Sequence, residues 1–207
     1  MKKRTKRTAG LVLLLGVVLL LYAALKEPTA ATEVQPDVAA RDSALAAMFV
    51  SMNIDDDFVV RQRENNFLRL SSEGVDVERS ICVYTYPGDE PDTARVLAMR
   101  DSVMKRNVKG EQPSMYMATE RRLPTKHSRV GEHFLRTEGR WEMENDMMGG
   151  PFVSYSLRDE ERHRIVVAEA FLYAPAPESD PTAMMKHMEA MLGTLKIIRP
   201  EDVNIQP

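Results

Sequence analysis

Apolar and polar residues recur along the chain with two different periods, which predict where helices and strands lie. Residues 38–52 carry apolar side chains three and four positions apart, the spacing of one helix face. The same spacing predicts helices over residues 92–103 and 181–197, and Asp180 or Thr182 can cap the last of these. The apolar positions of the first helix are Leu45, Met48, Phe49 and Met52.

Strands are predicted where β-branched and aromatic residues cluster or alternate with polar ones. Residues 80–86 form the clearest cluster of the first half. Residues 133–144 alternate strictly, which is typical of a strand with one packed and one wet face. Residues 163–174 are apolar on both faces apart from Glu169, which predicts a central strand covered on both sides. Further strands are predicted over residues 58–63, 66–71, 115–120 and 151–157, and residues 121–131 are predicted to be a surface connection.

These elements together predict an α+β fold. We expect one layered domain over residues 38–199, with an antiparallel sheet of five to six strands and two to three helices packed on it. Residues 200–207 follow as a C-terminal tail. The domain is long enough to bury a single hydrophobic core.

The first 25 residues have the pattern of a membrane-targeting segment. A basic stretch is followed by 17 uncharged residues, 9–25, which would span about 25 Å as a helix. Two interpretations stay open: an uncleaved transmembrane anchor, or a signal peptide that is cleaved so that the domain is secreted to the periplasm. In both, the basic residues stay in the cytoplasm and the domain lies outside it. Residues 26–37 are rich in Pro, Thr, Ala and Glu and are predicted to be a linker.

The net charge of the chain limits which partners are expected. The chain has a formal charge of −3, with 28 Lys and Arg against 31 Asp and Glu. Five of the cations lie in residues 1–7, so residues 8–207 carry 23 cations against 31 acids, a net −8. Nucleic acid is excluded as an expected partner, because binding it requires clustered Lys and Arg that neutralise phosphates.

Cysteine and methionine, whose sulfur atoms could bind a soft metal ion, stand at positions that the hydrophobic pattern assigns to the core. Cys82 lies inside a predicted strand, and a single cysteine can form neither an intramolecular disulfide nor a multi-thiolate metal site. Methionines at residues 184, 185, 188 and 191 lie near His187 and raise the alternative of a Cu(I) site. Their helical spacing favours core packing, with His187 off the stripe. We therefore predict no cofactor and no metal.

A glycine-rich stretch after the alternating strand is the main candidate contact region. Paired glycines allow a close approach of the backbone, which is useful either in a loop that touches a partner or in a turn that joins two strands. It is not a phosphate loop, because no helix start and no Lys-Ser/Thr pair follows it. The candidate contact residues are Trp141, Asp146, Met147, Gly149, Gly150 and Phe152, together with Glu169 of the later strand.

Glu169 is the candidate carboxylate, because it stands on an otherwise apolar strand. A buried carboxylate needs a cationic partner, and Arg136 or Arg140 of the neighbouring strand is predicted to supply it. The alternative is that Glu169 acts as the general acid/base of a hydrolase.

Several motifs occur in a fixed order along the domain. The most specific is Met-Gly-Gly-Pro-Phe-Val at residues 148–153, which follows Gly-Arg-Trp at residues 139–141. The others are residues 66–70 (NFLRL), 80–87 (SICVYTYP), 100–104 (RDSVM), 116–120 (YMATE), 171–175 (FLYAP) and 189–196 (EAMLGTLK). From about residue 45 to residue 198, this order resembles the bacterial family catalogued as domain of unknown function 4837.

The resemblance implies a location in the cell envelope and no established activity. Family members often carry a lipoprotein signal, but no cysteine follows the apolar run here, so a helix anchor must replace the lipid. The order of the last strands and helix is also similar to PsbP/Mog1-like sandwiches. We expect a membrane-anchored, non-enzymatic domain that binds an envelope protein or a small ligand; the alternative is an envelope hydrolase that uses Glu169.

Overall fold

The structure, a computed structural model, describes residues 37–73, 77–173 and 180–199. The predicted N-terminal membrane helix, nearly all of the predicted linker and the C-terminal tail lie outside these residues. None of the helices in the described ranges is long and apolar enough to cross a bilayer.

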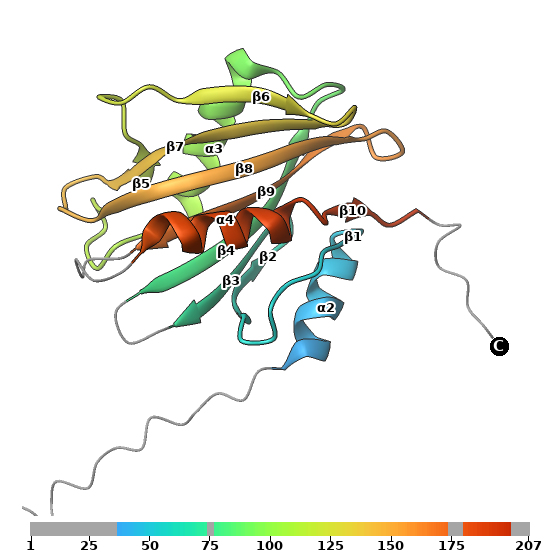
Figure 1. Cartoon of the computed structure of the whole chain (residues 1–207), viewed down its shortest axis with the longest axis horizontal. Coiled ribbons are helices and arrows are strands. Elements are labelled where there is room, and N and C mark those ends of the chain that lie inside the picture. Colours follow the sequence, from blue (N-terminus) through green and yellow to red (C-terminus); the bar gives the residue numbers. More distant parts are fainter. Residues whose placement is uncertain (1–36, 74–76, 174–179, 200–207) are drawn as a thin grey trace, which may run out of the picture. The chain divides into compact units, whose positions relative to one another are not determined.

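An antiparallel sheet of eight strands forms the centre of the domain (Figure 1). Its strand order is β2-β3-β4-β9-β8-β7-β5. β5 and β6 share the outer edge of β7: β5 pairs with residues 141–143 and β6 with residues 134–138. The sheet curls, which allows each face to enclose a core. The strands are β2 (Val59–Glu64), β3 (Phe67–Glu73), β4 (Glu78–Pro87), β5 (Met117–Thr119), β6 (Lys126–Val130), β7 (Phe134–Met143), β8 (Gly149–Asp159) and β9 (Arg164–Tyr173).

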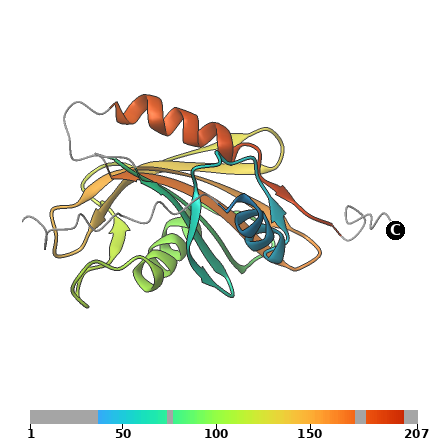
Figure 2. The ribbon, with the colours of Figure 1, turned by 90° about the horizontal axis from the view of Figure 1, so that it is seen from below.

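Three helices among the described residues pack on this sheet, and each begins at an aspartate. They are α2 (Val38–Ala47), α3 (Thr93–Asn107) and α4 (Pro181–Leu192). Asp37, Asp92 and Asp180 each accept a hydrogen bond from a backbone N–H of the first turn, which satisfies donors that the helix itself cannot. Figure 2 shows α4 on one face of the sheet and α3 on the other, whereas α2 packs at the β2 edge. The predicted α+β fold is confirmed.

Strand β9 separates two hydrophobic cores, as its sequence predicts. Val166, Ala168, Ala170 and Leu172 belong to the core under α4 and α2. Ile165, Val167 and Phe171 belong to the core on the α3 side. Every residue from Ile165 to Leu172 is buried, so β9 is the central covered strand expected from its two apolar faces.

The ends of the first and last helices differ from the prediction. α2 ends at Ala47 and not near residue 52, because Phe49 has a left-handed φ of 60° that breaks the helix. α4 ends at Leu192, before Gly193. The residues beyond both ends form a two-stranded ribbon of β1 (Val50–Ser51) and β10 (Lys196–Ile197).

The sheet also has more strands than predicted. Five to six were expected, but β6 lies in residues 121–131, which were interpreted as a surface connection. Lys126 of β6 pairs with Glu138 of β7, and Ser128 pairs with Arg136. A polar edge strand has no apolar alternation for sequence analysis to detect, and its charges protect the edge from aggregation.

The two glycines of the predicted contact region begin β8, and they are needed for packing. A Cβ atom on Gly150 would lie 2.0 Å from the carbonyl oxygen of Leu172. The indole Nε1 of Trp141 donates to that same oxygen over 3.0 Å. Gly150 therefore lets the backbones of β8 and β9 and the Trp141 ring meet.

We predict that Gly150→Ala destabilises the domain by at least about 2 kcal/mol, because the added methyl group collides with backbone that cannot move aside. Urea unfolding followed by circular dichroism measures this change. Gly193→Ala is the matched control, since its Cβ would meet nothing closer than 3.5 Å and its φ is helical. Equal stability of the two variants would contradict the packing role of Gly150.

Candidate functional site

Glu169 lies at the centre of the domain, in an ion pair with Arg100 of α3. Both side chains are buried, at 0% and 1% exposure. Arg100 Nε donates to both carboxylate oxygens over 3.0 Å, and Nη2 donates to Oε1 over 2.7 Å. The residues paired with Glu169 on the adjacent strands are Cys82 and Ser154, whose small side chains leave room for the guanidinium.

Other groups enclose this ion pair. Arg100 Nη1 donates to Thr119 Oγ1 over 2.9 Å, and the guanidinium carbon lies 3.8 Å from the centre of the Phe152 ring. The Tyr84 hydroxyl donates to Glu169 Oε2 over 3.5 Å. Burial raises the pKa of Glu169, and the charge of Arg100 opposes that shift.

The predicted ion pair at Glu169 is therefore confirmed, but its predicted partner is wrong. Arg136 instead binds Glu189 and Glu138, and Arg140 binds Glu120. Those arginines project from the face of β7 that is turned towards α4, whereas Glu169 faces the α3 core. The sealed carboxylate lines none of the three pockets described below, so this geometry does not support a general acid/base role.

The predicted contact region divides into a buried and an exposed part. Trp141, Gly150 and Phe152 are buried in the α3 core or beside it, so they have no free surface for a partner. Asp146 is exposed and Met147 is fully exposed, at the tip of the β7–β8 hairpin. Gly149 is half-buried at the start of β8. The stretch thus joins two strands, and only its tip is available for contact.

The methionines of α4 pack in the core as predicted, and Cys82 does so in β4. Met188 and Met191 are buried under the sheet, and burial raises the pKa of the Cys82 thiol, which makes it unreactive. His187 Nε2 lies 2.8 Å from Asp55 Oδ2, and the backbone N–H of Asp55 donates to Met191 Sδ over 3.4 Å, so His187 and Met191 both contact Asp55. Within the described residues, no group of three or more His, Cys, Asp or Glu side chains is placed to hold a metal ion.

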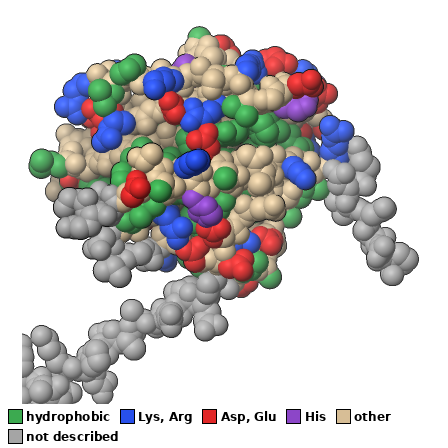
Figure 3. Space-filling view, in the orientation of Figure 1, with side chains coloured by type: hydrophobic (Ala, Val, Ile, Leu, Met, Phe, Trp, Pro, Cys, Tyr) green, Lys and Arg blue, Asp and Glu red, His purple; other side chains and the backbone are tan. Residues whose placement is uncertain are grey.

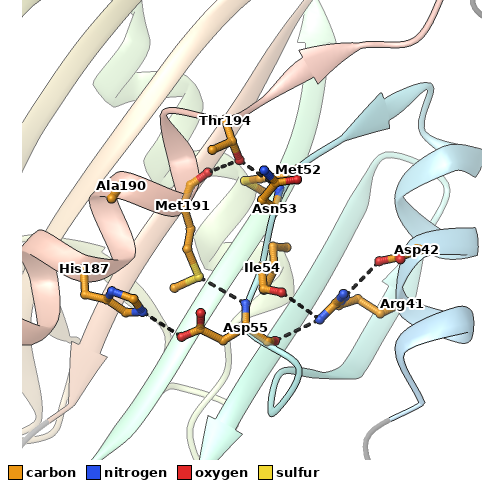
Figure 4. A pocket seen from close by; sticks show the side chains of 10 residues that line it. All are labelled: Arg41, Asp42, Met52, Asn53, Ile54, Asp55, His187, Ala190, Met191 and Thr194. Atoms are coloured by element: carbon orange, nitrogen blue, oxygen red, sulfur yellow. Dashed lines mark hydrogen bonds and ion pairs between the residues drawn. The ribbon is translucent and has the colours of Figure 1, made fainter.

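A first pocket, of about 450 Å³, lies between α2, α4 and the segment after β1 (Figure 4). His187 Nε2 lies 2.8 Å from Asp55 Oδ2, and the buried Arg41 donates to the carbonyl oxygens of Ile54 and Asp55. Asn53 donates its backbone N–H to Thr194 Oγ1. These polar groups form hydrogen bonds that hold the segment after β1 against both helices. We therefore interpret the pocket as part of the packing between these elements.

A second pocket, of about 410 Å³, lies between α4 and the solvent-facing side of β7. Arg136 forms a two-point ion pair with Glu189 of α4, with distances of 2.5 and 3.1 Å. Hydrogen bonding from Arg136 lowers the pKa of Glu189, and the Tyr155 hydroxyl also donates to that carboxylate. This arrangement fixes the outer side of α4 to the sheet.

A third pocket, of about 640 Å³, is the largest of the three and has the most distinct chemistry. It lies where the C-terminal end of α4 passes β7 and β8 and continues into β10. Its floor is apolar, and its rim carries charged side chains of both signs. The floor consists of Phe134, Leu157, Leu195 and Ile197. Figure 3 shows hydrophobic side chains between charged ones on this face of the domain.

Most rim charges of this third pocket are already matched. Asp159 is buried and pairs with Arg162 and Arg164 of the β8–β9 hairpin, and Arg158 pairs with Glu90 and Glu160. Among the described residues, Lys196 and Arg129 line the pocket and form no ion pair. Glu132 is the one lining acid without an ion pair among the described residues, so an apolar floor with two unmatched cations and one unmatched acid is suited to an amphipathic ligand with a charged part.

Sequence reasoning missed this pocket because its floor comes from the ends of three strands and from the segment between α4 and β10. The one available signal was Phe134, which stands in the charged row of the alternating strand. An aromatic residue on a predicted wet face indicates a local apolar surface. Leu195 and Ile197 were assigned to the last helix, so their separate placement was not predicted.

Comparison with known proteins supports the family assignment. The model of the family described as "Domain of unknown function (DUF4837)" matches residues 38–194, so the chain belongs to that family, as its motifs predicted. No curated protein matches the chain. A solved structure of a mutant of protein Mog1 is similar with a TM-score of 0.47 and 10% identity, over 74% of this chain and 93% of the Mog1 chain. That likeness is too low to support any argument about function.

Removing one partner of the Arg100–Glu169 pair is predicted to cost about 3–5 kcal/mol, because the other charge stays buried without compensation. We expect this loss for Arg100→Leu and for Glu169→Leu in urea unfolding. The double variant should be more stable than either single one, since it leaves no buried charge. Additive losses would show that the two side chains do not act as a pair.

We also predict that the free energy of unfolding decreases at acidic pH and that part of this decrease depends on Glu189. Its pKa is lowered in the folded state, so its contribution is fully present above the unfolded pKa of about 4.3 and is lost as the pH falls through the folded value. Glu189→Gln should therefore reduce stability at pH 7 and flatten the decline below pH 4.3. Thermal unfolding across this pH range checks it, and an unchanged decline would contradict the assignment.

Proposed function

We propose that this member of the domain of unknown function 4837 family is a membrane-anchored protein of the bacterial cell envelope, whose domain binds another envelope molecule without transforming it. The proposal joins two arguments. One concerns where the domain is located, and the other concerns what its surface can do.

The location rests on the first 25 residues. Five cations in residues 1–7 precede 17 uncharged residues, and this order keeps the N-terminus in the cytoplasm and directs the following chain across the membrane. A helix of that length is about 5 Å shorter than a typical hydrocarbon core, a mismatch that a bilayer accommodates by local thinning. An anchor of this kind keeps the domain at the outer surface of the inner membrane.

The single observation that supports binding is the third pocket. It combines an apolar floor with a charged rim, and its volume of about 640 Å³ lies in the range of small-ligand sites. The buried Asp159 is held by Arg162 and Arg164, so this part of the wall is formed before any ligand arrives. A preformed pocket loses little conformational entropy on binding.

The alternative of an envelope hydrolase has weaker support. Its proposed general acid/base was Glu169, which has no exposed surface and is held by Arg100 with three short hydrogen bonds. A proton donor or acceptor must come within hydrogen-bond reach of the substrate. In this arrangement α3 would have to leave the sheet for a substrate to reach Glu169.

The test places a photo-crosslinking amino acid at single positions of the full-length protein in living cells. At Leu157, on the pocket floor, we expect a crosslinked adduct in the membrane fraction, because a bound molecule contacts this position. The same amino acid at Arg106, which is exposed on α3 and lines none of the three pockets, is the matched control.

Other outcomes decide between the alternatives. An adduct at Met147 but not at Leu157 would move the contact surface to the β7–β8 hairpin tip. No adduct at either position, or full-length protein recovered only from the cytosol, would overturn the proposal.

A further inference from the structure

The third pocket lies between two strand edges, and the outer edge of β10 is the first. Ile198 donates its N–H to the carbonyl oxygen of Phe49, so these two residues are a hydrogen-bonded pair of the antiparallel ribbon. Ile197, which is opposite Val50, is then in the non-hydrogen-bonded position. Its N–H and C=O consequently point away from β1. Ile197 also lines the pocket.

The second edge belongs to the end of β8. Pairing of β8 with β9 continues to Asp159 opposite Arg164, but pairing with β7 stops at Ser156 opposite Leu135. Leu157, Arg158 and Asp159 therefore form a strand whose edge on the β7 side has no strand partner among the described residues. All three line the pocket.

An unpaired strand edge selects for a particular kind of ligand. A simple acyl chain could cover the apolar floor, but it offers nothing to the outward N–H and C=O of Ile197. An extended peptide satisfies such groups by adding a strand, and its alternate side chains point toward the floor.

The rim adds a charge preference. Lys196 precedes Ile197 on β10, and Arg129 lies on β6; neither forms an ion pair within the described part of the chain. Glu132 is the corresponding unmatched acid, and Arg158 is shared by Glu90 and Glu160, so the charge preference rests on the position of Lys196 on the β10 edge and not on the net charge of the pocket. Complementary charge favours an acidic partner.

We infer that the pocket binds an extended, acidic peptide segment of another protein by strand addition to β10, with apolar side chains of the segment on Phe134 and Leu157. The inference rests on the proposed binding function and names its ligand. Lys196 and Arg129 attract the acidic residues, and Ile197 exchanges main-chain hydrogen bonds with the segment.

The test uses the solubilised full-length protein and a fluorescein-labelled peptide of seven residues in which valine and glutamate alternate. Fluorescence polarisation measures its affinity. The double variant Lys196→Glu and Arg129→Glu should bind it at least about tenfold more weakly and should prefer a peptide in which lysine replaces glutamate. The matched control is Lys186→Glu with Arg106→Glu, which makes the same charge change at exposed positions outside the pocket.

Strand addition has its own test. N-methylation of alternate peptide amides removes hydrogen-bond donors from one edge of the peptide only. One of the two methylated series should lose binding and the other should keep it. Equal binding of both series would overturn strand addition.

Decanoate separates this inference from the proposed function. If decanoate binds to the wild-type domain and Leu157→Arg abolishes that binding, while the peptide does not bind, the pocket is a binding site but not for peptides. If neither decanoate nor the peptide binds, the proposed function fails as well. Circular dichroism of each variant verifies that it is folded.

Discussion

The domain depends on one buried ion pair that joins a helix to the central strand. Arg100 of α3 and Glu169 of β9 are 69 positions apart and make three hydrogen bonds with each other. Two charges removed from water are tolerated only when their geometry is good and their remaining polar atoms are satisfied. Here Thr119 and Tyr84 complete the hydrogen bonding, and the Phe152 ring covers the guanidinium. The position of α3 on its face of the sheet is thereby set.

On the opposite face of the sheet, α4 and α2 cover the larger of the two cores. α4 crosses β8 and β9 there, and its Glu189 is held by Arg136 of β7. The chain then leaves α4 at Gly193 and pairs with β1 in a ribbon that is separate from the ladder of the large sheet. The space between ribbon and sheet is the third pocket. Its location follows from where α4 ends more than from any single residue in its walls.

Much of this fold could be predicted from local sequence, because period and capping are local properties. The two faces of β9 and the packed side of β7 follow directly from alternation. The ion pair at Glu169 was predicted for the same reason, since a carboxylate among apolar neighbours needs a cation. Arg100 could not be identified, because a helical arginine has the same pattern whether it faces solvent or core. That choice is made only when α3 docks on the sheet.

The candidate site was harder to predict, because it arises from mismatched strand lengths. Among the described residues, β8 extends three residues past the last residue paired with β7, and β10 pairs on one edge only. Neither fact is written in the residues concerned, since Leu157 and Ile197 have the same apolar character as fully covered core positions. An unpaired edge is a liability in a soluble domain unless charges, a turn or a partner protects it. Rim charges protect the β8 edge, and the proposed peptide would cover the outward main chain of Ile197.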